Sequence, residues 1–129
     1  MKVTVDVEVR YGDLDTYGHV NNVVFFRYFE TARTKAFRKD FLELLNEGIY
    51  ILVVKAECEY KRPIQLVDKV FVTMEVVDIG NTSFTIAYKI HDDNNDTIYA
   101  TGKTVMVTFD NKINKPVKIP DKFLKLLKG

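Results

Sequence analysis

The sequence predicts an α+β domain in which a five-stranded antiparallel sheet wraps around one long central helix. Two observations carry this prediction. A single helical pattern after the first strand is apolar around most of its circumference, so this helix must be covered by other elements. From residue 49 to residue 109 the chain has strand patterns joined by short turns, which connect antiparallel neighbours. One sheet curling around the helix is the simplest packing of these elements. The length of 129 residues predicts a single domain over residues 1–129.

The chain begins with a pattern typical of a half-buried strand. Between residues 2 and 10, valines alternate with charged residues and a threonine, which places the valines on one face. Residues 11–20 form a loop that contains Gly12 and Gly18. Asn21 is a favourable N-cap residue for the helix that follows.

The long helix is predicted over residues 22–38. Its apolar face is made of aromatic residues and alanines, and its polar side carries charged residues and a threonine. The apolar arc is too wide for a surface helix, which is why we expect the sheet to wrap around it. A second, separate helical piece is predicted over residues 41–46, ended by Gly48.

Four further strands and a terminal helix complete the predicted domain. Turn-forming residues separate the strands, with glycine and asparagine at 80–81 and a run of aspartates and asparagines at 92–96. The predicted strands span residues 49–62, 69–79, 82–91 and 97–109. Residues 112–120 form an irregular tail with two prolines, and residues 121–128 form a short helix anchored by Phe123, Leu124 and Leu127.

Composition excludes several classes of function. The hydrophobic content of 47% and the charged content of 29% are typical of a globular protein, and the net charge of +1 provides no field that would attract nucleic acid or an anionic membrane. No segment reaches the ~20 apolar residues of a transmembrane helix. One cysteine forms no internal disulfide, which favours a cytoplasmic location.

A short polar loop places two carboxylates directly before the start of the buried helix. Asp13 and Asp15 precede Asn21 and Asn22 in this loop. Free backbone N–H groups at a helix N-terminus stabilise a developing negative charge. A carboxylate beside such a site is suited to acyl transfer or to hydrolysis.

The same residues carry a resemblance to a known family. The run DLDTYGHVNN at residues 13–22, followed by YFETAR at residues 28–33, resembles the signature of hotdog-fold acyl-CoA thioesterases, and specifically of the 4-hydroxybenzoyl-CoA thioesterase-like family. The resemblance implies the hotdog fold and the hydrolysis of an acyl-CoA thioester to a free carboxylic acid and coenzyme A. It implies no metal and no cofactor. It also implies a homodimer or homotetramer with active sites at the dimer interface.

The resemblance assigns roles to four residues of the loop and helix start. Asp15 matches the catalytic carboxylate, which could attack the thioester carbonyl or activate a water molecule. The backbone N–H of Asn22 would polarise the thioester oxygen. His19 is an auxiliary candidate that could orient the loop, contact the thioester or shuttle a proton, and a purely structural role is the alternative. Asn21 is a substrate-binding candidate whose side chain could hydrogen-bond the loop or the catalytic carboxylate, or serve only as the N-cap.

Lys61 and Arg62 are the best candidates for binding the phosphates of coenzyme A. They lie at the end of the long predicted strand, where alternation should turn only one of them toward the cleft. Lys103, Lys112 and Lys115 are further candidates. An apolar tunnel beside the helix would hold the acyl chain.

Three residues outside the motif's chemistry have structural interpretations. Asp13 should anchor the loop, with Arg10 or Arg33 as its partner. Glu30 and Arg33 lie three residues apart on the helix and could form an ion pair. Cys58 alternates with apolar neighbours, so it is expected to face inward as a small hydrophobic residue.

Two other functions remain open alternatives. The first is a non-catalytic acyl-CoA-binding module, against which the presence of Asp15 argues. The second is a hotdog hydratase or dehydratase, whose histidine and acidic residue are placed differently. No serine triad, phosphate-binding glycine loop or metal-ligand cluster is visible in the sequence.

Overall fold

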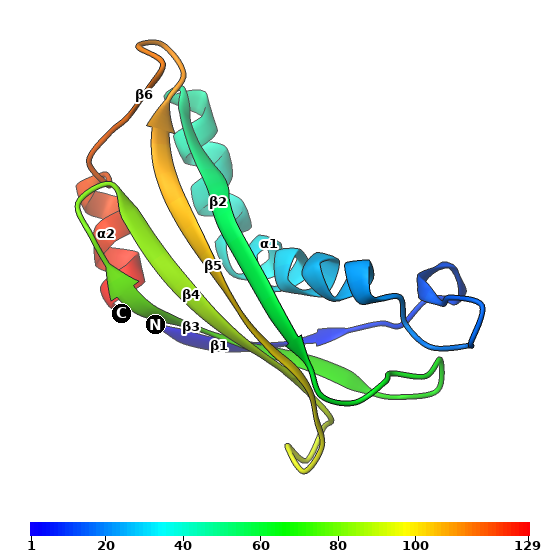
Figure 1. The fold of residues 1–129 in the computed structure, drawn as a ribbon. Coiled ribbons are helices and arrows are strands. Elements are labelled where there is room, and N and C mark those ends of the chain that lie inside the picture. Colours follow the sequence, from blue (N-terminus) through cyan, green and yellow to red (C-terminus); the bar gives the residue numbers. More distant parts are fainter.

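A single antiparallel sheet curves around a long helix, as Figure 1 shows for the computed structural model, which describes residues 1–129. The order of strands across the sheet is β1-β3-β4-β5-β2, and every neighbouring pair is antiparallel. The α+β class and the wrapped helix are therefore confirmed. The five main strands are β1 (Lys2–Val7), β2 (Ile49–Tyr60), β3 (Val70–Ile79), β4 (Ser83–His91) and β5 (Ile98–Asp110).

The long helix, α1, is continuous from Asn22 to Asn46 and has 25 residues. The prediction of two separate helical pieces is wrong. No proline or glycine interrupts residues 38–41, so nothing in the sequence breaks the helical hydrogen bonds there. The helix instead bends midway along its length (Figure 1), as long helices do when they follow the surface of a core. It ends where Gly48 takes a positive φ of 79°.

A sixth strand of two residues, β6 (Lys115–Pro116), lies within the tail that was predicted to be irregular. It pairs with the end of β5 through Phe109–Pro116 and Asp110–Lys115. Asn114 has a φ of 57°, a conformation that asparagine tolerates, and this reverses the chain so that it returns along β5. The predicted terminal helix is confirmed as α2 (Asp121–Lys128).

The core lies between the sheet and the inner face of α1. Phe29 of α1 is fully buried and stacks on Tyr88 of β4, with ring centroids 4.4 Å apart. Gly102 of β5 makes this contact possible, because a Cβ atom at that position would lie 2.5 Å from the Phe29 ring. At this position the sheet approaches the helix closely because no side chain intervenes.

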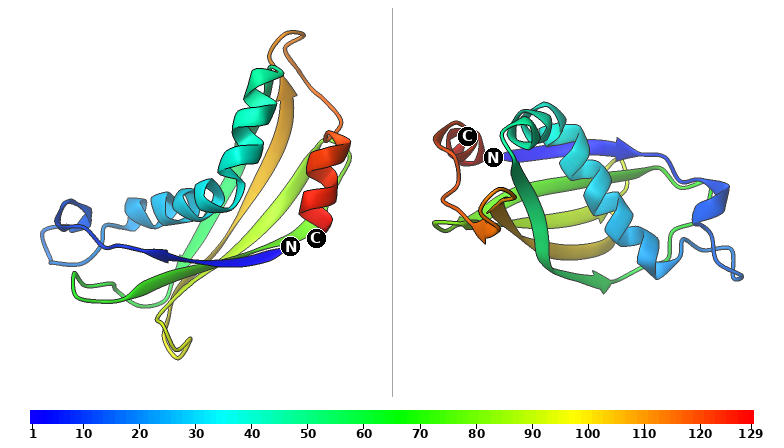
Figure 2. Two further views of the ribbon diagram at one scale, coloured as in Figure 1. Left: turned by 180° about the vertical axis from the view of Figure 1, so that it is seen from behind. Right: turned by 90° about the horizontal axis from the view of Figure 1, so that it is seen from above.

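Helix α2 closes one end of the core. Its Phe123 packs against Phe37 of α1 and against Phe84 of β4, with ring centroids 5.5 and 5.7 Å apart. Figure 2 shows α2 beside the C-terminal half of α1 and far from the opposite, N-terminal end of that helix. That N-terminal end is left open. Neither helix combines the length and the apolar character of a membrane-crossing segment.

Candidate active site

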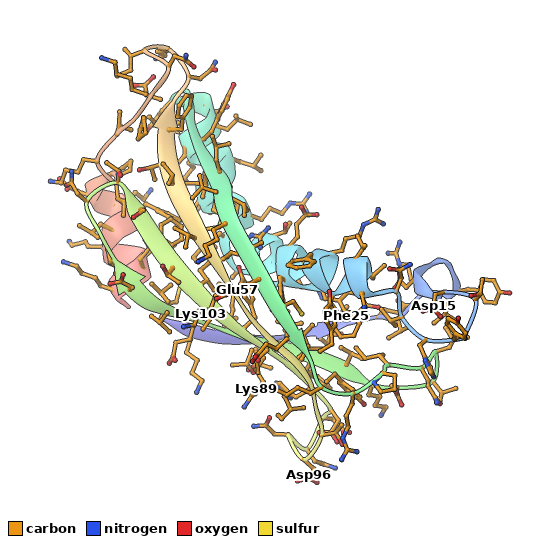
Figure 3. The ribbon with its side chains drawn as sticks, viewed as in Figure 1. Asp15, Phe25, Glu57, Lys89, Asp96 and Lys103 are labelled. Atoms are coloured by element: carbon orange, nitrogen blue, oxygen red, sulfur yellow. The ribbon has the colours of Figure 1, made fainter.

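The open N-terminal end of α1 contains a cavity of about 240 Å³ that gathers most of the residues singled out from the sequence. Figure 3 shows Asp15 on the loop that precedes α1 and Phe25 beneath the first turns of the helix. The lining residues come from this loop, from the first turn of α1 and from the end of β2. They are Asp15, His19, Val20, Asn22, Phe25, Tyr60, Lys61, Arg62 and Pro63.

Asp15 has one engaged and one free carboxylate oxygen. Its Oδ1 accepts hydrogen bonds from the backbone N–H groups of Tyr17, at 2.9 Å, and His19, at 3.2 Å. Its Oδ2 has no donor within the chain. The carboxylate therefore caps its own turn, as a loop aspartate often does, and still presents an unpaired oxygen in a residue that lines the cavity.

Backbone hydrogen bonds fix the loop that carries Asp15. The Asp15 N–H donates to the carbonyl of His19 at 2.7 Å, and Gly18 completes the turn with a φ of 77°. The Val20 N–H donates to the carbonyl of Ile64 at 2.8 Å, which ties the loop to the segment after β2. His19 thus lines the cavity on a rigid turn rather than on a free loop.

Asp13 anchors the same loop from the other side. Its Oδ2 accepts the backbone N–H of Arg10 and the hydroxyl of Tyr28, both at 2.9 Å. The expected anchoring role is confirmed with the Arg10 backbone as one partner, and Arg33 is not involved. Burial, together with the bond to Asp13, raises the pKa of Tyr28 well above its usual value.

The N-terminus of α1 offers an unengaged donor. Asn21 is the N-cap, because its Oδ1 accepts the N–H of Val23 at 3.1 Å, and its side chain is not part of the cavity lining. The N–H of Asn22 has no acceptor within the chain, whereas the Asn22 carbonyl accepts the Tyr60 hydroxyl at 2.7 Å. The first turn of the helix is thus held in place while one of its N–H groups stays free.

Lys61 and Arg62 both line the cavity, whereas strand alternation predicted that only one of them would face it. Strand alternation does not apply to them, because β2 ends at Tyr60. Their two N–H groups donate to the same carbonyl, that of Tyr99, at 2.9 and 3.1 Å. The chain turns at this point, and both residues border the cavity.

Tyr60 and Phe25 line the cavity and were not predicted from the sequence. Their rings meet edge to face with centroids 4.9 Å apart. Burial raises the pKa of the Tyr60 phenol. The alternation of Cys58 and Tyr60 on one face of β2 was the only available signal, and it does not identify which inward residue reaches the helix start.

Phe29, one turn further along α1, is fully buried against Tyr88 and belongs to the core rather than to the cavity lining. The acyl tunnel expected beside the helix stays a prediction. Cys58 is half-buried, and burial raises the pKa of its thiol, as expected for an inward-facing small residue. No three His, Cys, Asp or Glu side chains come together in a way that could hold a metal ion.

This arrangement has a definite chemical capacity. An anionic oxygen, a free helix-terminal N–H and two cationic side chains border one small cavity. A carboxylate can attack or deprotonate, and a free N–H at a helix N-terminus can stabilise an oxyanion. The two cations suit a phosphorylated ligand at the cavity edge.

Comparisons with known proteins identify the family. The model of the thioesterase-like superfamily matches residues 9–127. The chain is 27% identical over 117 residues to the acyl-CoA thioester hydrolase YbgC of Escherichia coli O157:H7, covering 88% of this chain and 87% of that protein. A crystal structure of a thioesterase from Thermus thermophilus, complexed with coenzyme A and Zn, superposes with a TM-score of 0.84 at 34% identity, covering 98% and 97% of the two chains.

A more distant structure supports the fold alone. The crystal structure of a 1,4-dihydroxy-2-naphthoyl-CoA thioesterase from Synechocystis matches with a TM-score of 0.91 at 17% identity, covering 99% of this chain and 96% of that one. The sheet, the wrapped helix and the family model agree with one another, and they bear out the resemblance seen at residues 13–33. The chain belongs to the thioesterase-like superfamily and is a thioester hydrolase of the hotdog type.

Proposed function

We propose that this protein hydrolyses an acyl-CoA thioester to a free carboxylic acid and coenzyme A. One observation carries the proposal. The unpaired carboxylate oxygen of Asp15 and the unengaged N–H of Asn22 belong to residues that border the same cavity. The names of the E. coli and T. thermophilus relatives agree with this substrate class.

Asp15 is the group that starts the reaction. Its free oxygen either attacks the thioester carbonyl carbon or takes a proton from a water molecule that does so. Both routes add one water overall and release a carboxylic acid and a thiol. The fixed turn around Asp15 keeps the carboxylate in position without further reorganisation.

The Asn22 N–H receives the negative charge that develops on the carbonyl oxygen. One such donor stabilises a transition state by roughly 3–4 kcal/mol. Asn21 acts indirectly, because it caps the helix and so fixes the direction of the Asn22 N–H. His19 lines the same cavity and is the residue we assign to assist proton transfer to the leaving thiolate.

Lys61 and Arg62, which line the cavity, bind the phosphates of coenzyme A. A second copy of the chain completes the enzyme. Strand β2 is an edge strand whose outer backbone groups have no partner in the chain, and unpaired edges of this length are normally covered. We place the protein in the cytoplasm, because its single cysteine, Cys58, has no partner for an internal disulfide.

The test is the release of free thiol from a panel of acyl-CoAs with short, long and aromatic acyl groups. We expect wild-type turnover on at least one of them and a loss of about 10²–10⁴ in kcat for Asp15→Asn. The melting temperature of the variant should stay close to that of the wild type, because Asn can still accept the two N–H bonds. Asp78→Asn, an exposed substitution near the C-terminal end of β3, has the same charge change and is the matched control.

Two results would overturn parts of this proposal. If Asp15→Asn retains kcat within about threefold of the wild type, the carboxylate is not the reactive group. If the wild type binds acyl-CoA but releases no thiol from any member of the panel, the protein is a binding module instead.

A further inference from the structure

A second cavity, on the β2 side of α1, contains a buried cation. It has a volume of about 290 Å³, and its floor is apolar, with Phe26 of α1 and Val53 and Ala56 of β2. Arg33 and Glu30 of α1 also line it. Arg33 is only 9% exposed, which is unusual for a charged side chain.

Arg33 has no negatively charged partner in its own chain. Its Nη1 donates to the Tyr88 hydroxyl at 3.1 Å, and that hydroxyl is 2.7 Å from the Thr104 hydroxyl. None of the four ion pairs of the chain includes Arg33. A buried cation with only neutral hydrogen-bond partners is costly, so an anion is expected to enter the cavity it lines.

Glu30 is the complementary group. It lies one helical turn before Arg33, is exposed, and makes no hydrogen bond or ion pair in its own chain. The expected ion pair between these two residues is absent, because the Arg33 guanidinium is directed to Tyr88 in the core. The same helix face therefore carries one unpaired anion and one uncompensated cation.

The exposed residues of the neighbouring strand, β2, indicate what kind of partner covers this face of α1. Leu52, Val53 and Val54 of β2 are 40%, 44% and 60% exposed, beside an unpaired strand edge. Such an edge pairs most simply with its own copy across a two-fold axis. A two-fold axis perpendicular to α1 runs the two copies of this helix antiparallel, and such an axis passing between the levels of residues 30 and 33 sets Glu30 opposite Arg33 twice.

We propose that Arg33 of one protomer binds the carboxylate of Glu30 of a second copy, which gives two symmetric ion pairs across the dimer. The proposal rests on the homodimer of the proposed function and adds the charge pair that fixes its register. The ion pairs lie between α1 and β2, so they hold together the two elements that border the catalytic cavity in each protomer.

The test is the dissociation constant of self-association, measured by analytical ultracentrifugation on the full chain. Glu30→Arg places three cations on one helix face, together with Arg27 and Arg33, and should weaken the dimer by roughly tenfold to a hundredfold. The double variant Glu30→Arg/Arg33→Glu exchanges the two charges and should restore most of the wild-type affinity of self-association. Glu47→Arg, at the exposed end of α1, has the same charge change and should leave the dimer unaltered.

Each result decides one part of the proposal. A wild type that is monomeric at micromolar concentration would remove the dimer itself. A dimeric wild type whose Glu30→Arg variant associates within about twofold of it would remove the ion pair and leave the dimer standing. If Arg33→Glu prevents folding, Glu30→Arg still decides, because Glu30 has no polar partner in its own chain. Saturable binding of octanoate to the wild-type dimer that is lost in Arg33→Gln would assign the cavity to a small anion and overturn the ion pair.

Discussion

The two ends of α1 differ in the interactions they make, although they belong to one uninterrupted helix. At the C-terminal half, Phe37 is fully buried and packs against Phe41 and Phe123, with ring centroids 5.4 and 5.5 Å apart. At the N-terminal end, Asp15 and Asn22 retain hydrogen-bonding groups that nothing in the chain satisfies. The C-terminal half stabilises the fold through packing. The N-terminal end contributes less packing energy and leaves polar groups free to react.

This difference shows how stability and chemistry are separated within one element. The cavity end is held by directed polar bonds, such as those of Asp13 to the Arg10 N–H and the Tyr28 hydroxyl. The opposite end is held by aromatic contacts that require no particular protonation state. Substitutions at the two ends should therefore change different observables.

The largest effect on stability is expected from Phe37→Ala. Removing a fully buried phenylalanine leaves a cavity, which costs about 3–5 kcal/mol of unfolding free energy. Catalysis by the molecules that remain folded should be nearly unchanged, because Phe37 lies in the half of the helix remote from the cavity. Urea unfolding and thiol release measured on the same preparation test both halves of this expectation.

Leu42→Ala provides the control at the same end of the helix. Leu42 is 54% exposed, so its truncation should cost less than about 1 kcal/mol. If Phe37→Ala lowers kcat as strongly as it lowers stability, the two ends are coupled and the separation proposed above is wrong.

A smaller effect is expected from pH at the cavity end. The pKa of Tyr28 is raised above its ordinary value of about 10, chiefly by burial and then by Asp13. Below about pH 10 its contribution to stability is fully present. Above that pH the unfolded chain loses the proton and the folded chain keeps it, so stability falls by up to about 1.4 kcal/mol per pH unit.

Tyr28→Phe isolates this contribution from those of the other tyrosines. The variant should be less stable than the wild type by about 1 kcal/mol at pH 9, and the gap should narrow as the pH approaches about 11. Tyr11→Phe, at an 83% exposed position, is the matched control, and its difference in unfolding free energy from the wild type should not change with pH. Urea unfolding across this pH range is the measurement, and a constant gap for Tyr28→Phe would contradict the expectation.

Much of the fold followed from local sequence patterns. Alternation located all five main strands to within about three residues, and the run at residues 13–22 indicated the loop, the cap and the helix start together. These features depend on near neighbours in the chain. The cap at Asn21, for example, requires only that a side-chain oxygen reach the N–H two residues later.

Features that depend on distant segments were missed or misplaced. Tyr60 reaches the carbonyl of Asn22 across 38 positions of sequence, and no local pattern encodes that contact. Arg33 was expected to pair with Glu30 on the same helix, but its guanidinium donates a hydrogen bond to Tyr88, 55 positions away in the sequence. Lys61 and Arg62 were treated as strand residues, whereas the tertiary bond to Tyr99 turns the chain there.

The smallest effect is expected from the cations at the cavity edge. Arg62 forms no ion pair in the chain, whereas the Lys61 ammonium lies 3.8 Å from the Glu59 carboxylate and shares its charge. Arg62→Ala should therefore raise KM for acyl-CoA more than Lys61→Ala does, by about three- to fivefold against about twofold.

Three features of the rise in KM identify a phosphate contact. The kcat should be nearly unchanged, because an exposed charge mainly supports ground-state binding. The rise in KM should shrink at high salt, since exposed charges are screened beyond a Debye length of ~10 Å at 0.1 M. It should also disappear when the same acyl group is carried by a short thiol without phosphates.

Lys39→Ala, which removes an exposed cation at the opposite half of α1, should change none of these quantities. If neither Lys61→Ala nor Arg62→Ala distinguishes the two substrates, the phosphates bind elsewhere, and Lys103 and the tail lysines Lys112 and Lys115 become the residues to replace.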